Sequence, residues 1–148
     1  MLQMSISLLY QFWIHTETID KMPKWFEAIM NTPSHQRVHH GSNPLYLDRN
    51  HAGILIIWDK IFGTFQPELK DEKVVYGLVK NINTFNPIKI AFIEWIYLFK
   101  DVLTGKKSIK NRILYLIKPP GWTHDDTGKI SNDLRNEWLI KKKAYDTK

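Results

Sequence analysis

Three of the chain's six histidines lie within six consecutive residues, as His35, His39 and His40, and this run constrains the fold more than any other feature. Thr32 and Pro33 precede the run with residue types that favour a helix start, and a glycine follows it immediately. Each helical residue turns the chain by about 100°, so His35 and His39 would share a face while His40 points about 140° away from His35. One ion would not reach all three rings. The spacing predicts a short helix that serves two neighbouring ions, or one ion and an imidazole that orients a ligand.

Two further histidines are candidate metal ligands. His15 ends an apolar stretch twenty residues before His35, and His51 lies between Asn50 and a run of branched apolar residues. Each has a simpler interpretation: His15 as a hydrogen-bonded histidine at a helix end, and His51 as part of a turn or helix cap. The sixth histidine, His124, lies in a polar segment and is predicted to be solvated. Iron, zinc, copper and nickel all accept imidazole, so spacing alone does not name the metal.

The chain contains no cysteine. This absence excludes disulfides, thiolate ligands and iron–sulfur ligation, so histidine, aspartate and glutamate are the side chains left to bind a transition metal. At 43% hydrophobic residues, a chain of 148 residues is able to bury a core of its own, and composition alone does not require a membrane.

Charge is distributed unevenly along the chain. Residues 1–62 hold five basic and five acidic side chains, whereas residues 63–148 hold sixteen and ten, so the net charge of +6 lies in the second part. That part contains the apolar and aromatic run 88–99, which is too short to span a bilayer. Its length and its flanking cations predict a helix in the membrane interface on the cytoplasmic side. The alternative is a core helix with a solvated basic flank. The cations are Lys100, Lys106, Lys107, Lys110, Arg112 and Lys118.

No segment offers the run of about twenty apolar residues that a membrane-crossing helix needs. The uncharged opening run, residues 1–14, would cover about 21 Å of a hydrocarbon core about 30 Å thick, and four polar residues interrupt it. We expect it to be the end of a crossing that begins outside this sequence. It lacks the basic start of a signal peptide.

The remaining pattern predicts helices and loops. Residues 2–18 and 23–30 read as helical, and residues 42–50 read as a loop. The charged residues 67–73 predict a surface linker. Residues 125–148 predict a polar tail that is helical or frayed.

Several motifs together carry a family resemblance. They are YQFWIHTE at residues 10–17, NTPSHQRVHHG at 31–41, DRN at 48–50 and ILIIWDKIFGTF at 54–65. With them the chain resembles the C-terminal half of the fatty acid hydroxylase/sterol desaturase superfamily. Three more motifs resemble the branch that contains alkylglycerol monooxygenase, namely VYGL at 75–78, NTFNP at 83–87 and PPGW at 119–122. The resemblance extends over nearly the whole chain and favours helix over strand for residues 54–61.

The resemblance implies an all-α fold, the C-terminal part of a helical integral-membrane di-iron oxygenase with interfacial helices and loops. Members of the superfamily use a histidine-rich di-iron centre and molecular oxygen to hydroxylate or desaturate lipids. The implied ligands are His35, His39 and His40 as the last histidine box, and His15 as the isolated ligand before it. His51 is implied as a further ligand or as a residue that orients one.

Four other positions near the histidines enter the interpretation. Asn31 and Asp59 are interpreted as residues that orient imidazoles, from their proximity in sequence. Gln36 lies inside the histidine box, at a position that is not one of the family's usual ligands. Gln11 precedes His15 by four residues, a spacing at which some relatives have a histidine pair.

The family builds its centre from more histidines than the five candidates of this chain. We therefore expect residues 1–66 to be a partial hydroxylase domain whose other boxes, of the HxxxH and HxxHH kinds, lie upstream. Residues 67–148 are expected to be a basic interfacial region with a polar tail. The implied partners are a lipid substrate, the membrane and a separate N-terminal half, with no nucleic acid. The implied electron donor is tetrahydropterin or an external electron-transfer chain, and the histidine box is expected on the cytoplasmic face of the membrane.

Two other functions stay open at this point. One is a non-catalytic, metal-binding accessory fragment that pairs with a separate histidine-box protein. The other is a basic nucleic-acid-binding module, for which the basic second part and its interleaved aromatic residues are the motivation. A truncated product without independent function is a third interpretation.

Overall fold

The computed structural model describes residues 2–105 and 107–146 of the chain. Within these residues all regular structure is helical, and β-type pairing is limited to an isolated antiparallel bridge between Gly41 and Tyr76. The predicted all-α class is therefore confirmed.

The chain divides into two compact units, Met1–Val79 and Lys80–Lys148. The first unit thus extends beyond residue 66, because the segment that follows this residue is bonded to the helix that carries the histidines. The functional division between residues 1–66 and 67–148 stays a prediction.

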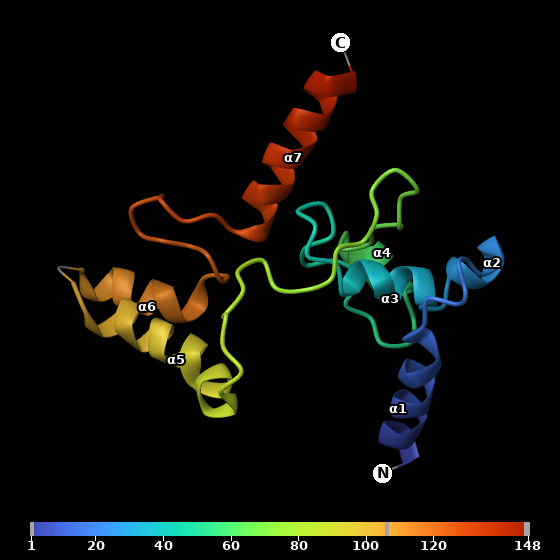
Figure 1. The fold of residues 1–148 in the computed structure, drawn as a ribbon, viewed down its shortest axis with the longest axis horizontal. Coiled ribbons are helices and arrows are strands. Elements are labelled where there is room, and N and C mark those ends of the chain that lie inside the picture. Colours follow the sequence, from blue (N-terminus) through green and yellow to red (C-terminus); the bar gives the residue numbers. More distant parts are fainter. Residues whose placement is uncertain (1, 106, 147–148) are drawn as a thin grey trace. The chain divides into compact units, whose positions relative to one another are not determined.

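Among the residues that the structure describes, four helices form the first unit. They are α1 (Leu2–Ile14), α2 (Lys24–Glu27), α3 (Pro33–His39) and α4 (Ile57–Phe62) (Figure 1). Of these, α1 contacts α3. The helices predicted at 2–18 and 23–30 are both present but shorter, since α1 ends at Ile14 and α2 is a single turn.

The interior of the first unit is small and unusually polar. Its fully buried apolar side chains are Ile14, Val38, Tyr46 and Ile56. Polar side chains buried among them include Asn31, Thr32, Ser34, Asn50 and Asp59. A buried polar group is costly unless it is hydrogen-bonded, so this interior depends on complete pairing as much as on apolar contact.

The histidine-bearing helix α3 begins as the sequence predicts. Thr32 has an extended N-cap conformation and Pro33 occupies the first turn. The helix ends at His39, and Gly41 lies just beyond it without a left-handed backbone. Glycine is required there by close packing, because a Cβ would lie 3.0 Å from Cδ2 of Tyr46. Glycine at this position lets the loop after α3 return against the helix.

Residues 54–61 show the expected preference for helix over strand. The helix runs from Ile57 to Phe62, and Gly63, with a φ of 72°, adopts the left-handed conformation that ends it. The β-branched residues at 54–57 therefore do not form a strand.

The segment at 67–73 differs from the surface linker that its charges predict. Arg37 of α3 holds Glu68 through two bonds, Nε to Oε1 at 3.0 Å and Nη2 to Oε2 at 2.7 Å. Tyr46 donates its hydroxyl to the carbonyl of Glu72 at 2.6 Å. The Glu68 side chain and the backbone of Glu72 thus have fixed partners in the first unit, which composition alone does not reveal.

In the described part of the second unit there are three helices: α5 (Pro87–Leu103), α6 (Ile109–Ile117) and α7 (Ser131–Asp146). Asn86 caps α5 by accepting the backbone N–H groups of Ile88 and Lys89, and α6 packs against α5. The run 88–99 is therefore helical as expected, and the polar tail is helical over α7. Lys106, one of the predicted flanking cations, lies outside the described residues. No helix in the part of the chain that the structure describes is both long and apolar enough to cross a membrane.

Asn50 fixes the loop that follows α3. It is buried and its backbone is left-handed, with a φ of 54°. Its Nδ2 donates to the carbonyls of His35 at 3.1 Å and Gln66 at 2.8 Å, and its Oδ1 accepts the backbone N–H of Gln66 at 2.9 Å. One side chain therefore joins α3 to the segment after α4.

Replacing Asn50 by alanine is expected to lower the free energy of unfolding by about 2–4 kcal/mol, because buried backbone groups lose their partners and alanine tolerates a left-handed backbone less well. Thermal unfolding followed by circular dichroism measures the change. The exposed Asn81→Ala is the control, with an expected effect within about 0.5 kcal/mol. Equal midpoints for the two variants would contradict the role given to Asn50.

Candidate metal centre

His15 and His40 bring their Nε2 atoms to 3.1 Å from each other. His15 lies just beyond the end of α1 and His40 caps the end of α3, so the contact between these helices positions the pair. Two imidazole nitrogens at this separation, each about 2.1 Å from one transition metal, would subtend about 95° at the ion. The pair therefore fits two adjacent ligand positions.

Backbone carbonyls orient two of the imidazole rings. Nδ1 of His15 lies 2.5 Å from the carbonyl oxygen of Gln11, and Nδ1 of His39 lies 3.2 Å from that of Arg49. A carbonyl only accepts, so Nδ1 of each ring is the donor, and in the neutral form of each ring Nε2 keeps its lone pair. Metal-binding histidines are commonly held in this way, by a hydrogen bond from the nitrogen that does not bind the metal.

Four of the five candidate ligands form a continuous row of rings. Ring centroids are 5.1 Å apart from His15 to His40, 5.2 Å from His40 to His39 and 6.0 Å from His39 to His51. The structure thus brings His15, His39, His40 and His51 together, although they come from three separate stretches of chain.

His35 is not part of this row. Its side chain is 2% exposed and packs edge-on against Phe65, with ring centroids 5.3 Å apart. Its Nδ1 is buried without a hydrogen-bond partner, and burial lowers the pKa of the ring. The helix therefore directs His35 toward the segment after α4 and not toward His15.

The expected ligand set places His35 beside His15 and His40. In the structure Gln36 lies there instead. Its Nε2 lies 3.1 Å from Nε2 of His15 and 3.0 Å from Nε2 of His40. The family resemblance does not count this position among the usual ligands. The spacing nevertheless contains the signal, because Gln36 precedes His40 by four residues and so shares its face of α3.

Asn31 and Asp59 act on the surroundings of the imidazoles and not on the rings. Asn31 donates from Nδ2 to Oε1 of Gln36 at 3.3 Å and to the carbonyl of Ala52 at 2.6 Å. The carboxylate of Asp59 accepts the backbone N–H groups of His51 at 2.8 Å and Ala52 at 2.9 Å. Asp59 thus holds the backbone that carries His51.

The electrostatic setting of His40 favours a neutral ring. Burial lowers its pKa, and the neighbouring His39 and His15 lower it further. A neutral imidazole keeps the lone pair that a metal needs, so this setting favours metal binding near pH 7.

The donors present fit part of one coordination shell. Nowhere in the described residues do three histidine, aspartate or glutamate side chains come close enough to hold one ion. His15 and His40 could therefore supply two imidazole ligands to one ion. His39 and His51 are the next rings in the row. The described residues do not assemble a complete di-iron set.

A cavity of about 570 Å³ opens beside the paired imidazoles, and its lining includes His15, His40, Ile14, Leu78 and Tyr76. Apolar side chains and imidazoles that could bind a metal thus line the same cavity.

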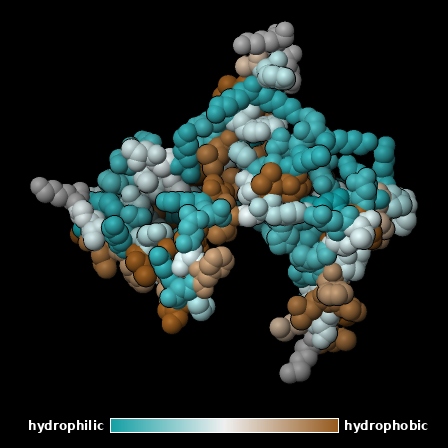
Figure 2. All heavy atoms as spheres, viewed as in Figure 1, coloured by the Kyte–Doolittle hydropathy of each residue, from teal (hydrophilic) through white to brown (hydrophobic). Residues whose placement is uncertain are grey.

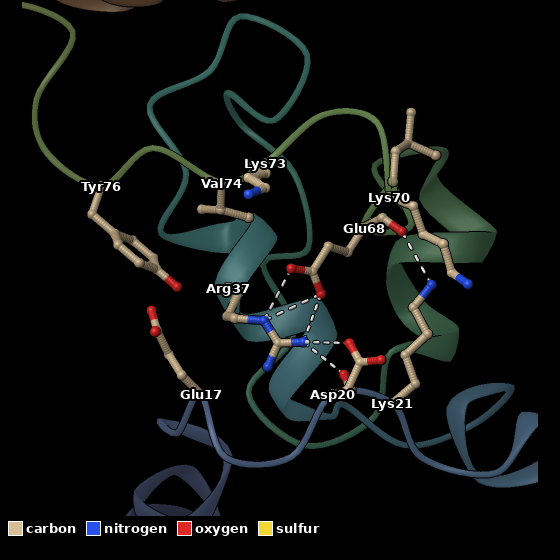
Figure 3. Close-up of a pocket in the computed structure, with 10 residues that line it drawn as sticks. Glu17, Asp20, Lys21, Arg37, Glu68, Lys70, Lys73, Val74 and Tyr76 are labelled. Carbon is tan, nitrogen blue, oxygen red and sulfur yellow. Dashed lines mark hydrogen bonds and ion pairs between the residues drawn. The ribbon is translucent and has the colours of Figure 1, made fainter.

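A second cavity, of about 350 Å³, shares Glu17, Arg37 and Tyr76 with the first. Figure 3 shows Arg37 directed at Glu68 and Asp20, and Tyr76 facing Glu17. Burial and the hydrogen bond to Glu17 raise the pKa of Tyr76 to about 12, so its hydroxyl keeps its proton at neutral pH.

Comparisons with known proteins agree with the motifs. Residues 1–64 match the family model described as fatty acid hydroxylase. The chain is 50% identical over 119 residues to the alkylglycerol monooxygenase of Homo sapiens, which covers 80% of this chain and 26% of that protein. The enzyme of Danio rerio is 50% identical over 117 residues, covering 79% and 25%. That of Caenorhabditis elegans is 43% identical over 124 residues, covering 78% and 24%.

The chain therefore spans about a quarter of the length of these curated relatives. No solved structure gave a significant match. The resemblance inferred from the histidine box and the later motifs is confirmed: residues 1–64 match the fatty acid hydroxylase family, and the chain is similar to alkylglycerol monooxygenases over 78–80% of its length.

Proposed function

We propose that this chain is part of an iron-dependent lipid monooxygenase, to which it contributes a row of metal-binding imidazoles at the cytoplasmic membrane surface. The observation that carries the proposal is the 3.1 Å approach of the Nε2 atoms of His15 and His40. The match to the fatty acid hydroxylase family and the similarity to alkylglycerol monooxygenases supply the class of reaction.

In this proposal His15 and His40 bind iron, and His39 and His51 extend the same shell or a neighbouring one. The carbonyls of Gln11 and Arg49 hold the rings of His15 and His39 with Nε2 unprotonated. Bound iron would supply the activation of molecular oxygen that oxidises a lipid C–H bond. The apolar walls formed by Ile14 and Leu78 would receive the lipid beside the imidazoles.

Two imidazoles do not complete the shell of an iron ion, and a di-iron centre needs more donors still. We propose that the missing ligands come from a separate N-terminal half that carries the HxxxH and HxxHH boxes. Electrons would come from tetrahydropterin or from an external electron-transfer chain.

The second unit offers a surface for the membrane. Large apolar side chains recur on α5 at intervals of three and four residues, which places them on one exposed stripe. They are Ile88, Phe92, Trp95, Phe99 and Leu103. A similar exposed stripe on α6 consists of Ile109, Ile113 and Leu116. Figure 2 shows hydrophobic side chains along the lower edge of these two helices.

Cations accompany these apolar stripes. Lys89, Lys100, Lys110 and Lys118 are exposed. Arg112, by contrast, donates to the carbonyls of Val102 and Gly105 within the unit. An apolar stripe beside exposed lysines fits the interface of a bilayer that contains anionic lipid. We propose such a bilayer as the partner of α5 and α6.

Metal binding by the purified chain tests the imidazole row. Replacing His15, His39 or His40 by alanine is expected to lower the anaerobic affinity for Fe²⁺ at least about tenfold, because each change removes a donor nitrogen. Co²⁺ absorption spectroscopy gives a second measurement of the same site. His124→Ala is the matched control and should bind as the unchanged chain does. Equal affinities in all variants would remove the row from the proposal.

Vesicle binding tests the second unit. Changing Trp95 and Phe99 to serine is expected to weaken co-sedimentation with phosphatidylcholine–phosphatidylserine vesicles about tenfold or more, because two large apolar side chains are lost from the interface. The matched control changes Trp58 and Phe62, an exposed and stacked pair of the first unit with the same spacing. Equal losses for both pairs, or equal binding to vesicles without phosphatidylserine, would exclude α5 as the basic docking surface.

A further inference from the structure

Three nitrogen atoms meet at the candidate metal centre, and only two of them belong to histidines. The separations are 3.1 Å between His15 and His40, 3.1 Å between His15 and Gln36, and 3.0 Å between His40 and Gln36, all measured between Nε2 atoms. This nearly equilateral triangle has the spacing of three ligands on one face of a six-coordinate ion, at about 2.1 Å from each donor. The side chain of Gln36 therefore stands where a third ligand would be.

The carboxamide of Gln36 presents its NH₂ group to the imidazoles. Its oxygen, Oε1, accepts from Nδ2 of Asn31 at 3.3 Å. Asn31 is itself fixed, because its Oδ1 accepts the N–H of Thr32 at 3.0 Å and its Nδ2 also donates to Ala52 at 2.6 Å. Turning the Gln36 oxygen toward the metal site would thus place two NH₂ groups against each other and lose the bond to Asn31.

An amide NH₂ is a donor and has no lone pair for a metal. Its two hydrogens can be given to the Nε2 atoms of His15 and His40, which are the atoms that metal binding needs. In the neutral ring of His15, Nε2 carries no proton because Nδ1 donates to the carbonyl of Gln11. The side chain of Gln36 is 8% exposed, so water competes little for its hydrogens.

We propose that Gln36 competes with the metal, occupying the third ligand position and donating its amide hydrogens to the imidazole nitrogens of His15 and His40. The proposal rests on the proposed function only in taking this pair as metal ligands. Metal entry then requires the loss of two hydrogen bonds, and the residue type at position 36 sets the affinity of the site.

Two substitutions separate competition from ligation. Gln36→Glu keeps the shape and the Asn31 contact but replaces the NH₂ by a ligand oxygen, and is expected to bind Co²⁺ or Fe²⁺ at least about tenfold more tightly. Gln36→Leu removes the donor without adding a ligand. It should bind the metal at least about threefold more tightly than the unchanged chain, because the Nε2 lone pairs of His15 and His40 are freed. Gln3→Glu, on an exposed position of α1, adds the same charge elsewhere and should have no effect.

The opposite result for leucine would overturn the inference, since weaker binding by Gln36→Leu would make Gln36 a ligand through its oxygen. Equal affinity in all Gln36 variants, with binding still dependent on His15 and His40, would overturn the competition and leave the proposed function standing. Failure of the unchanged chain and of Gln36→Glu to bind either metal would overturn both.

Nitrogen NMR of the metal-free chain provides a readout that does not depend on metal. Under the proposal, Gln36→Leu shifts the imidazole Nε2 resonances of His15 and His40 and leaves those of His124 unchanged. Unshifted resonances would show that the amide hydrogens are not shared with the imidazoles, and would overturn the inference even in a chain that binds metal. Matching circular dichroism spectra of the variants would establish that the fold is retained.

Discussion

The geometry of the first unit depends on the complete hydrogen-bonding of one buried residue, Asn31, through both its side chain and its backbone. This residue lies where α1, α3 and the loop before α4 meet, and every polar group that it has is paired. Its partners are the hydroxyl of Tyr10, the carbonyls of Ala52 and Ile54, the N–H of Thr32 and the oxygen of Gln36. In an interior with few apolar side chains, leaving any of these groups unpaired would cost more than the hydrogen bond itself contributes. The network therefore fixes the helices that carry the imidazoles.

The same polar interior explains how a short chain orders residues from distant stretches. Asp59 joins the backbone of His51 to α4. Asn50 joins α3 to the segment that follows α4. Arg37 anchors the stretch around Glu68 to α3, so that Tyr76 and Leu78 reach the wall of the cavity beside the imidazoles. Small apolar cores leave much of the stability to such networks, which also position side chains more narrowly than apolar packing does.

Local signals predict the elements well, and tertiary contacts decide which side chains meet. Thr32 and Pro33 predict the start of α3, and Gly63 predicts the end of α4, because these signals act within a few residues. The family resemblance and the all-α class follow from motifs, and both are confirmed. Spacing places Gln36 on the same face of α3 as His40, but it does not show which face of α3 meets His15. That choice depends on tertiary contacts, with Phe65 against His35 on one side and α1 on the other. The partners of Glu68 and Glu72 could not be predicted from the sequence either, because charge composition does not show which residues are paired.

The imidazole rings of His15 and His39 are held by main-chain oxygens, at Gln11 and Arg49. A main-chain acceptor exists whatever side chain stands at those positions, as long as the local backbone path is kept. Ring orientation is thereby uncoupled from residue identity at 11 and 49, and evolutionary drift there would leave the lone pairs aimed as before. Substitutions at positions 11 and 49 are consequently a poor guide to whether the site is intact.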